Sequence, residues 1–180
     1  ATAVGTAINV NPIYLFHIIK NINLVCGTDC SQAEDLFDAT QNLDGFVFTS
    51  SMLKTCAVNL SKICNDLRLL SSGPKTGIGE INLPPKQNGS SIMPGKINPV
   101  IPEVVSQVAY NVIGNDTTVT LAAEAGQLEL NAFEPVVFYK IFESIDTMTG
   151  AVRTLIDNCI LGITANRKRC EQLVESSVSL

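Results

Sequence analysis

One stretch of the sequence, residues 86 to 99, combines side chains that could do acid–base and anion-binding chemistry. It reads Lys-Gln-Asn-Gly-Ser-Ser-Ile-Met-Pro-Gly-Lys-Ile-Asn-Pro, and this mixture of small, polar and turn-forming residues is typical of an exposed loop. Lys96 adds a positive charge and Asn98 an amide donor near its end. We expect Asn98 to cap a helix that begins at Pro99, because helices favour asparagine at the N-cap and proline in the first turn.

A helix start of this kind is suited to binding an anion. The unpaired N–H groups of a first helical turn and the helix dipole attract negative charge, and Lys96 would strengthen that attraction. The residues therefore indicate a carboxylate or phosphate site. An ordinary connector of glycine, proline and serine with a good helix cap explains the same composition, so the residues alone leave both interpretations open.

Long apolar stripes with helical spacing flank this segment and must position it. The stripes cover residues 53–70, 99–126 and 132–159. Shorter helices are expected over residues 12–22 and 166–174 and from Ser31, where Glu34 would complete a capping box. Residues 80–83 look extended. The sequence thus predicts an all-α fold, an elongated long-helix bundle that buries further surface against partners, because such helices exceed what a compact chain of 180 residues needs.

Composition narrows the class of protein. Hydrophobic residues make up 46% and charged residues 16% of the chain, which argues against a disordered protein. A formal net charge of −5 offers no basic surface to nucleic acid. No apolar run approaches the roughly 20 residues of a membrane span, and we see no signal peptide. We therefore expect a cytoplasmic protein with no nucleic-acid or membrane partner.

The cysteines and scattered acidic residues give no sign of a metal site. Of the six cysteines, Cys56, Cys64 and Cys159 fall among apolar residues at helical spacing, so we expect reduced thiols in the core. No Cys-x-x-Cys spacing occurs. Three further carboxylates are expected to be solvated or to contact another subunit rather than to bind metal: Asp116, Glu124 and Glu129.

Residues 89 to 99, Gly-Ser-Ser-Ile-Met-Pro-Gly-Lys-Ile-Asn-Pro, resemble the signature of the fumarase and aspartase superfamily, G-S-x-x-M-x-x-K-x-N, at every fixed position. The resemblance continues on both sides, through residues 65–74, 79–84, 114–116 and 129–131. It implies the all-α, long-helix bundle of that superfamily. Residues 1–180 are then interpreted as part of its central helical domain, with the signature loop at 86–98 and without the family's N-terminal and C-terminal parts.

Within the superfamily, residues 100–105 and 117–127 resemble the aspartate ammonia-lyases more than the class II fumarases. That resemblance implies a carbon–nitrogen lyase that interconverts L-aspartate with fumarate and ammonia, acts as a homotetramer and needs no cofactor. Two alternatives stay open. One is a fumarase-type hydratase that uses the same loop, and the other is a helical self-association fragment without activity.

The resemblance also assigns roles to single residues. Ser90 would be the general base that removes a proton next to the β-carboxylate of the substrate. Lys96 and Asn98 would hold that carboxylate and stabilise the enediolate. Ser91 would donate to the same charge, or serve only the loop's own hydrogen bonding. Glu103 matches a glutamate that pairs with a histidine in the family.

The histidine itself is a departure from the family pattern. The sequence has one, His17, and it does not follow the Gly-Arg-Thr motif that carries the family's site histidine. We expect His17 to be structural. The Ser-Ser-x-Met-Pro-Thr-Asn type of substrate-binding segment is also absent from these residues, so we expect the isolated chain to be inactive.

Overall fold

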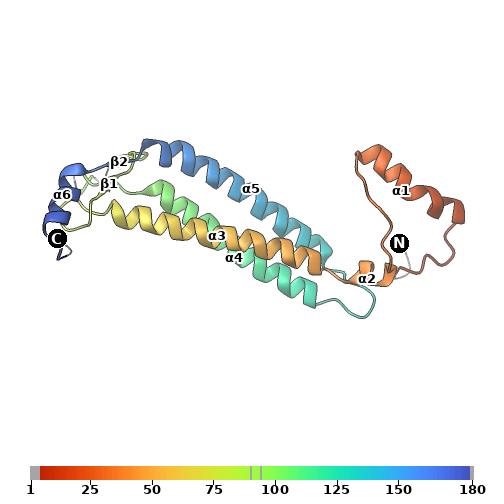
Figure 1. The fold of residues 1–180 in the computed structure, drawn as a ribbon. Helices are drawn as coiled ribbons and strands as arrows, with labels where there is room; N and C mark the ends of the chain where they lie inside the picture. Colours follow the sequence, from red (N-terminus) through yellow and green to blue (C-terminus); the bar gives the residue numbers. More distant parts are fainter. Residues whose placement is uncertain (1–4, 90, 94, 179–180) are drawn as a thin grey trace.

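Three long helices side by side dominate the computed structural model, which describes residues 5–89, 91–93 and 95–178 (Figure 1). They are α3 (Asp44–Leu70), α4 (Val100–Glu124) and α5 (Glu134–Asn158). Helix α4 packs along both α3 and α5, which contact each other far less. The predicted all-α, elongated bundle of long helices is confirmed.

Short elements lie at the two ends of this bundle (Figure 1). At one end are α1 (Pro12–Cys26) and α2 (Leu36–Gln41). At the other end, strands β1 (Ile81–Asn82) and β2 (Thr164–Ala165) form an antiparallel pair beside α6 (Arg167–Glu175), and a 3-10 turn, η1 (Ile160–Gly162), follows α5. Residues 86–99 connect β1 to α4, so the bundle presents the candidate loop at this second end.

The core forms three layers along the bundle. Near α2 it contains Leu43, Val119, Ala122, Val137 and Ile141; in the middle Ala57, Ala109, Val112 and Met148; and near the loop Cys64, Val105, Ala151, Leu155 and Cys159. The alanines and valines let the helices approach closely. Burial of Cys64 and Cys159 confirms the prediction for these thiols, but Cys56 is exposed and that prediction is wrong. All six cysteines are free.

Helix α3 begins at Asp44, well before the predicted start at Leu53. The run Thr49-Ser50-Ser51 interrupts the apolar stripe and hid the first turns. Two of these hydroxyls bond the helix's own backbone: Thr49 Oγ1 donates to the Gly45 carbonyl at 2.9 Å and Ser51 Oγ to the Phe48 carbonyl at 2.7 Å. Ser50 Oγ instead donates to the Asp116 carboxylate on α4. A polar run therefore continues a helix when each hydroxyl finds a partner.

The predicted helix from Ser31 is wrong. Helix α2 starts at Leu36 because Asp35, rather than Ser31, is the N-cap, and its carboxylate accepts the N–H groups of Phe37 at 2.8 Å and Asp38 at 3.1 Å. Helix α1 runs past its predicted end to Cys26, where Gly27 adopts a left-handed φ of 65° and ends it. The extended residues 80–83 are confirmed as β1, but its partner β2 was not predicted.

Candidate functional site

Residues 86–99 are shaped mainly by turns of their own backbone. The Lys96 N–H donates to the Met93 carbonyl at 3.1 Å, and Gly95 has a φ of 87°, which favours glycine. A Cβ at Gly89 would lie 3.0 Å from the Lys96 carbonyl oxygen. The glycines at 89 and 95 therefore allow the loop to fold back on itself.

The predicted site residues differ in exposure. Ser91 and Lys96 are exposed and Asn98 is half-buried, whereas Ser90 lies outside the described residues. No carboxylate in the described part of the chain is within 4.0 Å of the Lys96 amine. The Lys96 charge is therefore free to meet a ligand.

The start of α4 differs from the prediction. Pro99 is the N-cap residue, Val100 is the first helical residue, and no side chain caps the helix. The prediction that Asn98 is the cap is wrong, because the chain turns one residue later: the Asn98 carbonyl accepts the Val100 N–H at 2.9 Å. The Asn98 side-chain amide is thus not used in capping and remains available next to Lys96.

Glu103 stands in the first turn of α4 and faces a cation on α3. Its carboxylate lies 3.9 Å from the guanidinium of Arg68, in the last turn of α3. The two side chains are 38% and 42% exposed, so the pair is a weak one. Arg68 was not predicted as a site residue, although an arginine at the end of the helix before the loop was a visible signal. It places a positive charge near Glu103 from the neighbouring helix.

The histidine expected to pair with Glu103 is not supplied by the described fold. His17 is exposed on α1, where its ring meets Phe16 edge-on at 4.9 Å, and α1 lies at the far end of the bundle from the loop (Figure 1). The structure therefore brings Lys96, Asn98 and Glu103 to one end of the bundle but leaves His17 at the other.

Two cavities lie close to the ends of the bundle, and the predicted residues line neither. One of about 540 Å³ lies beside α6 and includes Ser72, Glu80 and Arg169. The other, of about 780 Å³, lies between the start of α3 and the end of α4 and includes Asp44, Phe48 and Glu124. The loop thus presents its side chains on an open surface, and a closed substrate pocket would need further surfaces around it.

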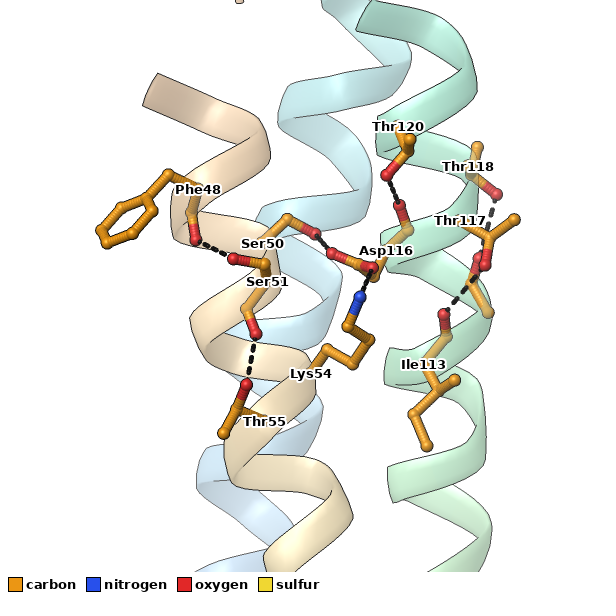
Figure 2. Close-up of polar contacts among 11 residues, drawn as sticks. Phe48, Ser50, Ser51, Lys54, Thr55, Ile113, Asp116, Thr117, Thr118 and Thr120 are labelled. Atoms are coloured by element: carbon orange, nitrogen blue, oxygen red, sulfur yellow. Dashed lines mark hydrogen bonds and ion pairs between the residues drawn. The ribbon is translucent and has the colours of Figure 1, made fainter. Parts of the chain in front are cut away.

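The three carboxylates considered as metal ligands do not form a metal site. No group of three potential ligands occurs in the described ranges. Asp116 is not solvated as predicted: it is 5% exposed and binds Ser50 and Lys54 on α3 (Figure 2). Among the described helices, none is long and apolar enough to cross a membrane.

Comparison with known proteins agrees with the bundle and the loop. Residues 1–114 match the family described as "Lyase", so the chain belongs to the lyase family. The aspartate ammonia-lyase of Pseudomonas aeruginosa is 58% identical over 179 residues, which are 99% of this chain and 38% of that protein. The chain thus spans about two fifths of the length of such relatives.

Solved structures show the same fold. The fumarate lyase:delta crystallin of Brucella melitensis, bound to cobalt, aligns with a TM-score of 0.92 and 51% identity, over 99% of this chain and 39% of that one. The class II fumarase of Schistosoma mansoni aligns with a TM-score of 0.87 and 31% identity, over 98% of this chain and 40% of that one.

Proposed function

We propose that the protein carrying this chain is an aspartate ammonia-lyase, which converts L-aspartate reversibly to fumarate and ammonia. The observation that carries the proposal is the 58% identity to the Pseudomonas aeruginosa enzyme across nearly the whole chain, against 31% to the Schistosoma mansoni fumarase. The segment that leads into α4, in which Ser91 and Lys96 are exposed, supports it.

In this proposal the loop removes a proton and holds the resulting charge. Ser90, as the alkoxide, takes the proton from the carbon next to the β-carboxylate. Lys96 and Asn98 bind that carboxylate and stabilise the enediolate, and Ser91 donates to the same charge. The C–N bond then breaks and ammonia leaves with the bonding electrons. Two observations support these roles: no carboxylate in the described part of the chain lies within 4.0 Å of the Lys96 amine, and the Asn98 amide does not cap α4.

Glu103 acts in this proposal through a histidine. The family resemblance pairs this glutamate with a histidine, and His17 lies at the other end of the bundle. We infer that the partner histidine comes from outside residues 1–180 or from a neighbouring subunit. Arg68 then keeps the Glu103 carboxylate in place from the opposite side.

We infer that the assembly is a cytoplasmic homotetramer with a small dicarboxylate as substrate. Large side chains stay exposed along the bundle, among them Tyr110, Leu121, Tyr139 and Phe142, which supports burial against further copies. Sedimentation should show a species larger than the 19.3 kDa of one chain at tens of micromolar protein. A stable monomer at that concentration would contradict the inference.

The decisive test compares two substrates of the complete gene product that contains these residues. We expect fumarate release from saturating L-aspartate and essentially none from L-malate, because a polar pocket that binds an ammonium group rejects a substrate that leaves its acceptors unpaired. Faster turnover of L-malate would favour a fumarase-type hydratase, the second candidate, for which the Schistosoma mansoni structure is the supporting observation.

The 180-residue chain alone serves as the matched control. Its loop is exposed and lines neither of the two cavities, so we expect no aspartate-dependent fumarate above the blank. Activity of this chain, in a preparation free of longer enzyme, would show that the loop needs no surrounding surface.

A further inference from the structure

A buried carboxylate near the middle of α4 ties that helix to α3. Asp116 accepts a hydrogen bond from Ser50 Oγ at 2.8 Å and an ion-paired one from Lys54 Nζ at 2.5 Å (Figure 2). Ser50 is also buried, and Lys54 reaches in from a partly exposed position. Every one of these groups loses its partner if the two helices slide past each other.

The residue before Asp116 ties α4 to its other neighbour at the same level. The Asn115 amide donates to Glu143 Oε2 at 2.9 Å and to Ser144 Oγ at 3.1 Å, both on α5. Asn115 is 4% exposed. Because successive side chains on a helix point about 100° apart, two adjacent residues reach two different partner helices. Within the described part of the chain, side-chain hydrogen bonds between the long helices occur only at this level.

Apart from the weak Arg68–Glu103 ion pair at the loop end, the contacts described between these helices are mainly apolar. The layers on either side contain Ala57, Ala109, Val112 and Val119. Apolar attraction is not directional, so a shift of α4 by one turn, about 5.4 Å, would replace one apolar contact by another. The same shift would leave the Asp116 carboxylate buried without a partner, which is strongly unfavourable.

We propose that Asn115 and Asp116 set the axial register of α4 against both flanking helices and so act as positioning residues for the loop. Helix α4 carries Glu103 in its first turn and continues directly from Lys96 and Asn98. A rigid helix transmits an axial shift undiminished along its length, and Glu103 lies about 18 Å along α4 from Asn115. A one-turn slip would therefore carry Glu103 past Arg68 and displace the loop's exit. The catalytic part of this inference rests on the proposed function, whereas the register does not.

The first experiment measures the register directly in the complete gene product. Spin labels on unnatural amino acids replace Asn59 on α3 and Asn111 on α4, both exposed, so the cysteines stay untouched. Labelled protein is diluted with unlabelled protein before pulsed EPR. We expect a single distance in the parent. We expect an added population, at a distance that the parent does not show, in the double variant Lys54→Met/Asp116→Leu, which removes both charges together.

Activity then distinguishes positioning from folding. In Lys54→Met/Asp116→Leu we expect kcat to fall in proportion to the shifted population, KM to stay unchanged and the melting temperature not to fall, because apolar residues replace a buried ion pair. Lys54→Arg, which keeps the charge, should retain the parent distance and kcat. The matched control, Val112→Ala, should lower the melting temperature without changing the distance.

A second variant keeps the test open if the first does not fold. Asn115→Leu/Ser144→Ala removes the ties to α5, with labels at Asn111 and the exposed Thr147. A parent-like distance distribution in the folded variants would overturn the proposal, whatever the activity. A parent protein without aspartate lyase activity would instead refute the proposed function, and the distances would still decide the register.

Discussion

The three-helix bundle and the segment 86–99 follow opposite rules of packing. In the bundle, side chains of α3, α4 and α5 meet in three apolar layers and one buried polar level. In the segment, the described backbone turns on itself, and Ser91 and Lys96 are exposed. The difference teaches that apolar burial in the bundle stabilises this chain, whereas its candidate chemistry lies on a segment with exposed side chains. We therefore expect substitutions in the apolar layers to change mainly stability, and substitutions in the segment to change mainly activity.

Ser90→Ala in the complete protein is expected to give the largest effect on activity with no effect on stability. If Ser90 is the base, turnover of L-aspartate should fall by about 10²–10⁴-fold, the usual contribution of general-base catalysis. The melting temperature should not change, because the described residues on either side, Gly89 and Ser91, are exposed. Fumarate release and thermal unfolding measure the two effects. Ser91→Ala is the matched control with a smaller loss, and near-parental turnover of Ser90→Ala would place the base elsewhere.

The converse change is Leu155→Ala in the bundle. Leu155 is 5% exposed in the layer nearest the loop, so the cavity left behind should lower the free energy of unfolding by about 2–5 kcal/mol. We expect kcat at low temperature to stay near the parent value. Denaturant unfolding provides the measurement, and Leu161→Ala, at a residue 77% exposed, is the control with less than about 0.5 kcal/mol. If Leu155→Ala and Leu161→Ala lowered the free energy of unfolding equally, Leu161 would have to be buried by contacts with other copies of the chain.

Thiol reactivity offers a finer probe of the same contrast. Burial, with a smaller contribution from Cys159, raises the pKa of the Cys64 thiol from 9.0 to about 11, while Cys56 on the same helix is exposed. Thiol reagents attack the thiolate, so at pH 8 Cys56 should react rapidly and Cys64 only on unfolding. Mass spectrometry of the labelled peptides measures both, and Cys56→Ser should remove the fast signal of its own peptide but not that of the exposed Cys26 and Cys30. Fast labelling of Cys64 in the folded protein would mean that the bundle opens locally.

The smallest expected effect is on the pH dependence of the melting temperature. Hydrogen bonds from Lys140 and then from Asn115 lower the pKa of Glu143 below its ordinary 4.5. A lowered pKa stabilises the folded state above pH 4.5, and this contribution disappears as the pH falls below that value. Glu143→Gln should therefore lower the melting temperature slightly at neutral pH and leave it nearly unchanged well below pH 4.5, which flattens the acid side of a plot of melting temperature against pH. If the melting temperature of Glu143→Gln falls as steeply in acid as that of the parent, the loss of stability at acidic pH comes from other carboxylates.

Helical periodicity was sufficient for α4 and α5 because their buried positions repeat without interruption. It was not sufficient for the start of α3, where Ser50 is buried for its bond to Asp116 and therefore looks out of pattern. Two-residue strands have no period, so the pairing of β1 with β2 could not be read from residues 81 and 82. The start of α3 and the pairing of β1 with β2 both depend on contacts between segments distant in the sequence, and not on the local conformational preferences of the residues.

In the candidate site, too, the sequence predicted some features and missed others. Lys96 and the approach of the loop to a helix start followed from residue types, and the role of Ser90 came from the family resemblance. The cap at Asn98 failed because the chain turns at Pro99 instead. Arg68 was missed because its meeting with Glu103 depends on how the ends of α3 and α4 are aligned. The sequence was thus sufficient to locate the candidate reactive residues, whereas their contacts with other side chains depend on how the helices pack.

The small strand pair at the loop end has a mechanical consequence. Besides β1 and β2, the Asn166 N–H donates to the Glu80 carbonyl at 2.8 Å, and Arg169 Nε donates to the Ile78 carbonyl at 2.9 Å. These bonds hold the chain shortly before the loop. The connection between two held elements is therefore shortened from residues 71–99 to residues 84–99. By the entropy of chain closure, ordering this shorter tether costs about 0.5 kcal/mol less. The strand pair thus fixes the start of the segment that leads to α4, and α4 itself fixes its end.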